Sequence, residues 1–284
     1  MTSRRLDDGT RTAEPDGALG ERGGVRCERG VLDERAVSDV VGYVLVFALV
    51  TATIGTVFAV GFVGVEERQN AERVANVERA FDVLDDNVRD LQRYEDPSRA
   101  TEIRLSGGTL SLEAETTMTL EYENSSGVFE YGNSPIPGSM STLTYTNGDT
   151  TLAYEGGAWF RVDGDRATMR SPPRFVSNDN QTVLPVVRLL RESGAEPIRA
   201  DGTVQVSTAT RGSRTLQYPE PEPGDVDAIR LRIESPYADA WADHFDDTDE
   251  FAVSRPSDGE VVLTLEEDDD VFLRVIGVEV SLRR

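Results

Sequence analysis

The chain has 284 residues, of which 52 are acidic and 29 basic, so its net charge is −23 and its sequence pI is about 4.4. This balance argues against nucleic-acid binding, because the phosphate backbone repels such a surface. All the basic residues are arginine, and an acidic surface without lysine is typical of proteins in concentrated salt, where counterions screen the repulsion. We interpret most acidic side chains as a solvated, halophilic surface.

Residues 1–36 are predicted to form a cytoplasmic leader. They mix arginines, acidic residues and glycines without an apolar period, which indicates a disordered segment. Cys27 is the only cysteine, so removal of the leader would leave no disulfide and no thiol nucleophile. Translation that starts at Val31 would give a shorter leader, and the sequence leaves both starts open.

Residues 37–65 are predicted to form a single transmembrane helix. No residue from 40 to 65 is charged, and at about 1.5 Å per residue such a helix exceeds the bilayer core of about 30 Å. Arginines before it favour a cytoplasmic N-terminal flank and an outer C-terminal domain. Small residues recur on one helical face and suit helix packing, or are simply common in membrane helices. They are Ala48, Ala52, Gly55 and Ala59.

Residues 66–96 are predicted to continue this helix as a soluble, amphipathic extension. Apolar residues recur every three or four positions and are separated by charged ones, and Pro97 supplies the stop. We call these apolar residues the seam: Val74, Val77, Phe81, Leu84, Val88 and Leu91. The seam is expected to pack either on the chain's own β domain or on neighbouring helices.

A basic and a small residue stand directly before the apolar run, in Arg35-Ala36-Val37-Ser38. This arrangement resembles the class III, prepilin-type signal of archaeal type IV pilin-like proteins, including uncharacterised haloarchaeal ones. The resemblance implies a prepilin peptidase that cuts between Ala36 and Val37, and other pilin-like subunits as partners. That family commonly has proline after the serine, where this chain has Asp39. The alternative is a plain N-terminal membrane anchor.

Residues 97–284 are predicted to form an extracytoplasmic, mostly antiparallel β domain of broadly sandwich-like kind, which makes the chain α+β. We expect hairpins around Gly107-Gly108, around Asn147-Gly148 and across residues 163–166. Further strands are expected at 183–190, 204–209, 216–218, 229–233, 261–265 and 272–282, and a short helix at 237–245.

Catalytic signals are missing from the sequence. His244 is the only histidine, and no nucleophile elbow, phosphate-binding loop or paired cysteine motif occurs, so neither an enzyme nor a cofactor is expected. Acidic clusters at 246–250 and 266–270 lack the spacing of a calcium loop, and no metal site is predicted. Asn124 and Asn180 begin glycosylation sequons in the part expected outside the cell.

Two classes of function follow from the sequence. The first is a pilin-like structural protein of the cell surface, a minor or accessory subunit of a pilus or pseudopilus. The second is a membrane-anchored domain that binds a ligand or an envelope protein and never polymerises. The first is favoured by Arg35-Ala36-Val37-Ser38 together with the unbroken helix.

Overall fold

The computed structural model describes residues 31–94, 97–131, 136, 139–178, 181–194, 196–218, 226–248, 251–265 and 270–284. For residues 31–37 and 60–67 it describes the backbone alone. The chain divides into two compact units, Met1–Gly64 and Val65–Arg284. The amphipathic half of the long helix therefore belongs to the same unit as the β-sheet.

Helix α1 spans Val31–Tyr94 and ends shortly before Pro97, as predicted. Its start differs from the prediction, because the helix begins six residues before Val37, inside the expected leader. Residues 31–36 are Val-Leu-Asp-Glu-Arg-Ala, which include strong helix formers and neither glycine nor proline. The disorder predicted from the composition of the leader therefore does not extend to residues 31–36, which are helical.

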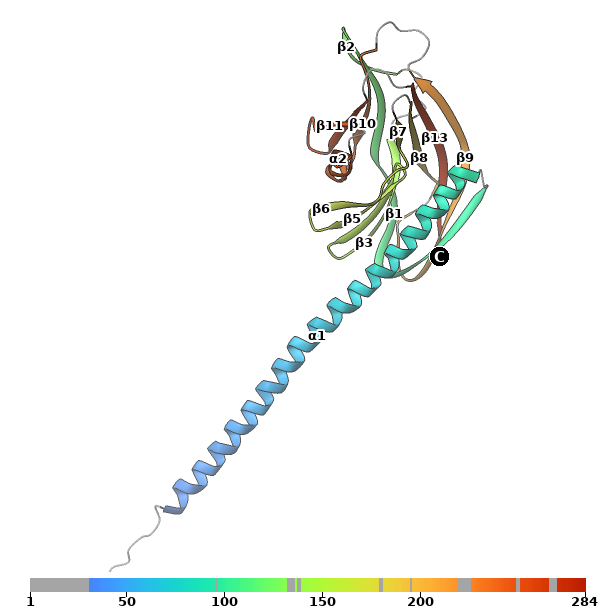
Figure 1. The fold of residues 1–284 in the computed structure, drawn as a ribbon. Helices are drawn as coiled ribbons and strands as arrows, with labels where there is room; N and C mark the ends of the chain where they lie inside the picture. The colour runs from blue at the N-terminus through green and yellow to red at the C-terminus, as the bar shows by residue number, and fades with distance from the viewer. Residues whose placement is uncertain are drawn as a thin grey trace, which may run out of the picture. The chain divides into compact units, whose positions relative to one another are not determined.

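The β domain is one large sheet that is almost entirely antiparallel (Figure 1). Its main path runs β11-β12-β10-β1-β9-β13-β8-β3-β4-β5-β6, with β2 on β1 and β7 on β8, and the pair of β13 with β8 is parallel. The strands are β1 Ser98–Asn124, β2 Gly127–Glu130, β3 Ser139–Asn147, β4 Thr150–Glu155, β5 Ala158–Asp163, β6 Arg166–Ser171, β7 Val176–Asn178, β8 Gln181–Arg191, β9 Ile198–Tyr218, β10 Ala228–Glu234, β11 Ala252–Ser254, β12 Glu260–Leu265 and β13 Asp270–Arg283. The predicted β-rich, mostly antiparallel domain is confirmed.

The strands do not separate into the two sheets of a simple sandwich. Strand β1 pairs with β3 as well as with β9 and β10, and Ser141 of β3 pairs with Leu189 of β8. The pairings therefore close a ring through β1, β9, β13, β8 and β3. The long strands β1 and β9 carry bulges that bend them, which lets one strand pair on different parts of the sheet.

The predicted hairpin at Gly107-Gly108 is wrong, because β1 runs straight through these residues. Gly107 has a φ of 94° and lies where the register with β9 shifts, so it makes a bulge and not a turn. A Cβ on Gly108 would lie 2.2 Å from a ring carbon of Tyr145 on β3. The absence of a side chain at Gly108 therefore leaves room for the ring of Tyr145.

Replacing Gly108 by alanine should lower the free energy of unfolding by about 1–3 kcal/mol, because the new methyl group overlaps the Tyr145 ring. Gly202 on β9 is the matched control, since a Cβ there has no heavy atom within 4 Å. Gly202→Ala should change the free energy by less than about 0.5 kcal/mol. Denaturant titrations in molar salt measure both, and equal losses would contradict the close packing at Gly108.

Several local predictions are confirmed. The β3–β4 hairpin turns at Gly148, and β5 pairs with β6 from Asp163 opposite Arg166. The strands expected at 183–190, 229–233, 261–265 and 272–282 are present, as is the short helix, α2 Ala238–Asp246. The pieces expected at 204–209 and 216–218 belong to one strand, β9, which continues through a bulge at Arg211.

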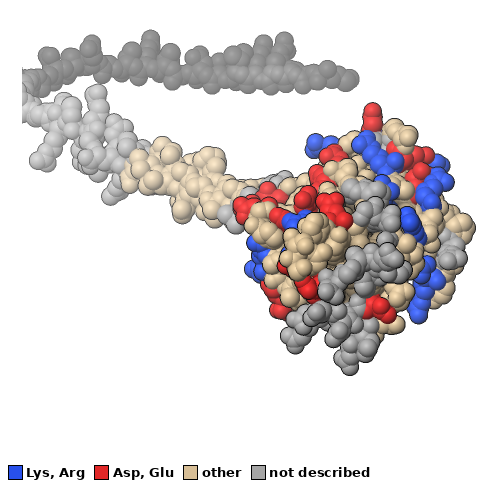
Figure 2. All heavy atoms as spheres, turned by 90° about the horizontal axis from the view of Figure 1, so that it is seen from above, with Lys and Arg blue, Asp and Glu red and all other residues tan. Residues whose placement is uncertain are grey.

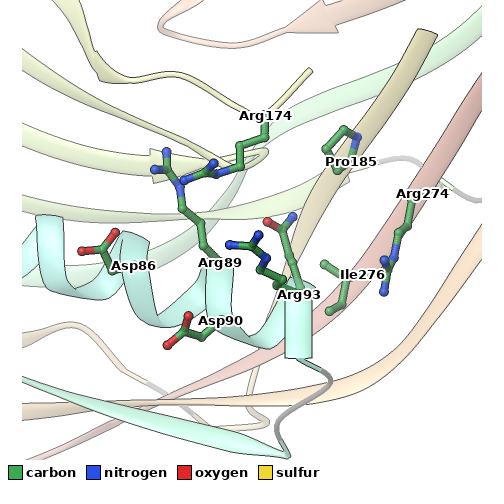
Figure 3. A pocket seen from close by; sticks show the side chains of 9 residues that line it. Asp86, Arg89, Asp90, Arg93, Arg174, Pro185, Arg274 and Ile276 are labelled. Carbon is green, nitrogen blue, oxygen red and sulfur yellow. The ribbon is translucent and has the colours of Figure 1, made fainter. Parts of the chain in front are cut away.

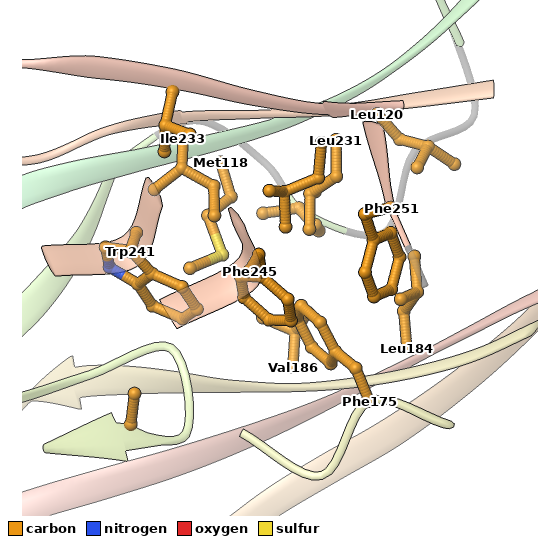
Figure 4. Close-up of a cluster of buried hydrophobic side chains, with 14 of the residues drawn as sticks. Met118, Leu120, Phe175, Leu184, Val186, Leu231, Ile233, Trp241, Phe245 and Phe251 are labelled. Carbon is orange, nitrogen blue, oxygen red and sulfur yellow. The ribbon is translucent and has the colours of Figure 1, made fainter. Parts of the chain in front are cut away.

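Two apolar clusters hold the β domain together. One lies around α2, where aromatic rings of Phe175, Trp241, Phe245 and Phe251 pack against one another and against residues of β1, β8 and β10 (Figure 4). The other joins the seam of α1 to residues of β1, β3, β9 and β13. Each cluster is covered by one helix, so α1 is an integral part of the core.

Candidate functional site

The first half of α1 contains a stretch that is long and apolar enough to cross a membrane. It spans Ser38–Ala59, which is 22 residues with a mean hydropathy of 2.2, and none of its side chains is buried. Thr53 and Thr56 donate hydroxyl hydrogen bonds to the carbonyl oxygens of Leu49 and Ala52. Their hydroxyl groups are therefore satisfied within the helix, which removes the cost of placing them in lipid.

The predicted packing ridge lies within this stretch. Ala48, Ala52, Gly55 and Ala59 are all exposed, and a Cβ on Gly55 would have no heavy atom within 4 Å. The ridge is thus open to another helix. The predicted processing residues Arg35, Ala36 and Val37 lie on the helical backbone of α1, and their side chains are outside the described residues.

The second half of α1 is used differently, because its seam is buried in the β domain. All six seam residues have exposures of 6% or less. The ring of Phe81 lies 6.2 Å from that of Trp159 on β5, and Glu78 forms an ion pair with Arg161 on the same strand. Of the two expected partners for the seam, the structure bears out the chain's own β domain.

A polar cluster joins the last turns of α1 to the end of β6 and to the first residue after it. The Asp85 carboxylate accepts one hydrogen bond, from Ser171 Oγ at 2.7 Å, and lies 2.9 Å from Arg89 Nη2. Arg89 Nη2 also donates to Ser171 Oγ and to the carbonyl of Pro172. Burial raises the pKa of Asp85, opposed by the Ser171 hydrogen bond and by Arg89. Arg89 is thereby held in one orientation.

Next to this cluster lies a pocket of about 610 Å³, which we call the arginine-lined pocket (Figure 3). Its walls come from the end of α1, from the loop after β6, and from β8 and β13. Arginines outnumber aspartates four to two among the residues that line it. The lining residues are Asp86, Arg89, Asp90, Gln92, Arg93, Arg174, Pro185, Arg274 and Ile276.

The surface of the β domain is uneven in charge despite the overall excess of acid. Figure 2 shows arginine side chains gathered along one side of the domain, with acidic side chains more frequent elsewhere in that view. A chain of net charge −23 therefore still presents locally basic surface. Such local fields, and not the net charge, decide which small ions approach a given site.

A second polar centre, at Glu155, is enclosed completely. The carboxylate is 0% exposed and accepts four hydrogen bonds: from Ser235 Oγ at 2.6 Å, Trp241 Nε1 at 2.9 Å, Thr142 Oγ1 at 3.0 Å and Thr116 Oγ1. Burial raises its pKa, and these donors oppose the rise. With every lone pair occupied and no opening to solvent, Glu155 ties together β1, β3, β4 and α2, and it has no access to a ligand.

The remaining sequence candidates do not come together in one site. His244 is half-buried at the end of α2, with its ring edge-on to Phe245. Among the described residues no group of three histidine, cysteine or acidic side chains is placed to hold a metal. Asn124 is half-buried at the β1–β2 turn, where its Oδ1 accepts the Ser126 N–H at 2.9 Å, while Asn180 lies outside the described residues.

Sequence reasoning missed both polar centres. The arginine-lined pocket joins residues from four distant segments, so no spacing reveals it. Glu155 precedes Gly156-Gly157, both with positive φ, at the β4–β5 turn, and this glycine pair was a hairpin signal that could have drawn attention to the position.

Comparisons with known proteins add a family without a known function. A family model described as "Family of unknown function (DUF7289)" matches residues 35–281, a range that begins at Arg35 and covers part of the first unit and nearly all of the second. An uncharacterized protein of Archaeoglobus fulgidus is 32% identical over 79 residues, so this chain spans about a quarter of that protein (26%) and the match covers 28% of this chain. No solved structure matches the chain.

Proposed function

The chain belongs to the family of unknown function DUF7289, and we propose that it is a membrane-anchored surface protein of the type IV pilin kind. In this proposal it is a minor or accessory subunit of a pilus- or pseudopilus-like assembly. A prepilin peptidase removes residues 1–36, the apolar helix anchors the chain in a single pass, and the β domain lies outside the cell. Its partners are the membrane and other pilin-like subunits.

The contrast between the two halves of α1 carries the proposal. Side chains of Ser38–Ala59 are apolar and exposed, whereas the seam that follows is buried by the β domain. An exposed apolar surface of this length needs lipid or other apolar helices around it. A retained apolar segment that leads into a helix packed on a β domain is the arrangement that the pilin resemblance implies.

Processing at the predicted bond tests the proposal. In a haloarchaeal host with its own prepilin peptidase, the wild-type chain should lose residues 1–36, and its new N-terminus should read Val37-Ser38-Asp39. Arg35→Gln and Ala36→Leu should each leave most of the chain at precursor size, because the basic and small residues before the bond are the features that the enzyme is proposed to read. Immunoblots of membrane fractions and N-terminal sequencing measure the outcome.

Arg29→Gln is the matched control, since it removes an arginine of the leader outside the motif and should leave processing unchanged. A wild-type chain that keeps precursor size would contradict the pilin-like proposal. It would leave a plain N-terminal anchor.

One observation favours the second candidate, a membrane-anchored binding domain that does not polymerise. The arginine-lined pocket offers a site of about 610 Å³, within the range of small-molecule sites. Disulfide cross-linking of Ala52→Cys in membranes, with Cys27 replaced by serine, separates the candidates. A subunit that packs through the ridge of Ala48, Ala52, Gly55 and Ala59 should give cross-linked products, and a solitary domain should give none.

A further inference from the structure

We propose that the arginine-lined pocket binds a small organic polyanion, a molecule with a short carbon skeleton and at least two negative charges on carboxylate or phosphate groups. The proposal concerns the β domain alone and does not depend on processing or on assembly into a filament. It rests on the charge of the pocket, on the exposure and orientation of its arginines, and on its volume.

The charge of the pocket is opposite to that of the chain. Four arginines face two aspartates here, whereas acidic residues outnumber basic ones 52 to 29 in the whole sequence. One of the two aspartates, Asp90, also lies 3.4 Å from Arg99 outside the pocket, so its charge is shared. In concentrated salt, long-range attraction is screened within about 3 Å at 1 M. A ligand must therefore be held by direct contact with the guanidinium groups.

Two of the arginines are available for such contact. Arg93 and Arg174 are exposed and form no ion pair within the part of the chain that the structure describes. Arg93 lies with its guanidinium carbon 5.6 Å from the centre of the Tyr94 ring. Each guanidinium group can donate two parallel hydrogen bonds to a carboxylate or a phosphate.

A third arginine is already oriented. Arg89 is held by Asp85, Ser171 and the carbonyl of Pro172, and Figure 3 shows its guanidinium group beside that of Arg174. The Asp85 carboxylate attracts both guanidinium groups, and its side chain is buried, with 4% exposure. Its single negative charge can compensate only one of the two positive charges. A bound anion on the open side of the pocket would compensate the second. This arrangement lowers the cost of binding at Arg89, because this side chain is already ordered before the anion arrives.

The size and the lining of the pocket indicate an organic ligand. A volume of about 610 Å³ exceeds what a single phosphate or sulfate ion fills. Half-buried Pro185 of β8 adds an apolar wall beside the arginines, whereas Ile276 of β13 lines the pocket with only 2% of its surface exposed. A carbon skeleton suits this wall, while its anionic groups face the guanidinium side.

Isothermal titration of the full chain in detergent and molar KCl tests the proposal. Citrate is the carboxylate probe and glycerol 3-phosphate the phosphate probe, with acetate as a singly charged control. We expect saturable binding of one molecule of citrate or glycerol 3-phosphate, with the better probe identifying the anionic group. Arg93→Gln and Arg174→Gln should each weaken it about tenfold or more, because each removes charged hydrogen bonds.

Arg104→Gln is the matched control, since Arg104 is exposed on β1 outside the pocket, and it should leave binding unchanged. Thermal unfolding without ligand shows whether each variant is folded. We expect all of them to fold, because the exposed Arg93 and Arg174 are not part of the core. Failure of both polyanions to bind would overturn the proposal. Equal affinity for acetate, or equal weakening by Arg104→Gln, would overturn it as well.

Discussion

Replacing Phe81 by alanine should lower the free energy of unfolding of the β domain by about 3–5 kcal/mol. Phe81 lies in the middle of the seam and is 0% exposed, and its ring packs near that of Trp159 on β5. Truncation removes a large buried apolar surface and leaves a cavity that the rigid helix and sheet cannot close. Denaturant titrations of the full chain in detergent and molar salt, followed by tryptophan fluorescence, measure the change.

Val83 provides the matched control on the same helical segment. It is 51% exposed, so Val83→Ala should change the free energy by less than about 0.5 kcal/mol. Equal effects of the two substitutions would contradict the burial of the seam against the β domain. They would indicate instead that this half of α1 is free to pack on neighbouring helices.

The seam could be predicted from the sequence because its signal is local. Its six residues repeat at helical spacing, and Pro97 marks the stop, so helix, face and end follow from neighbouring residues. The same is true of the β3–β4 and β5–β6 hairpins, where a glycine stands at each turn. Which surface covers the seam is not local, and the sequence left two partners open.

Long strands were harder to predict, because a glycine pair marks both turns and bulges. At Gly107-Gly108 the choice is decided by Tyr145, a residue on another strand whose ring occupies the space that a side chain would fill. The one-strand continuity of β9 has a similar cause, since its bulge at Arg211 is fixed by pairing with β13. Non-local pairing therefore overrides the local turn signal.

The candidate sites divide in the same way. The apolar stretch Ser38–Ala59 is continuous in the sequence and was found there. The arginine-lined pocket and the hydrogen-bond donors around Glu155 come from separate strands and helices, so these groupings become visible only when the fold is known. In a chain with so many charged residues, no single arginine or glutamate stands out by its type.

Replacing Glu155 by leucine should lower the free energy of unfolding by about 2–6 kcal/mol, because Trp241 Nε1 and the Ser235 hydroxyl lose their acceptor inside the protein. The hydroxyl oxygens of Thr116 and Thr142 lie 2.9 Å apart, so these two side chains can still form a hydrogen bond with each other. Glu155→Gln is the matched variant. Its carbonyl oxygen can accept from Trp241 and Ser235 while its amide donates to the threonine oxygens, so the loss near neutral pH should be about 1 kcal/mol or less.

The pH dependence of these two forms tests the charge of the centre. Burial raises the pKa of Glu155 above its ordinary value of 4.5, so the folded state binds the proton more tightly than the unfolded state does. The resulting stabilisation is fully present below 4.5 and is lost as the pH rises through the raised pKa. Wild type should therefore gain stability relative to Glu155→Gln as the pH falls from neutral towards 4.5. Denaturant titrations of wild type and Glu155→Gln, from neutral pH down to 4.5, measure the difference between their free energies of unfolding. The effect of the other carboxylates is the same in the two forms and cancels in this difference. A difference that stays constant would show that the four donors balance burial, and one that shifts towards the glutamine variant would show that they outweigh it.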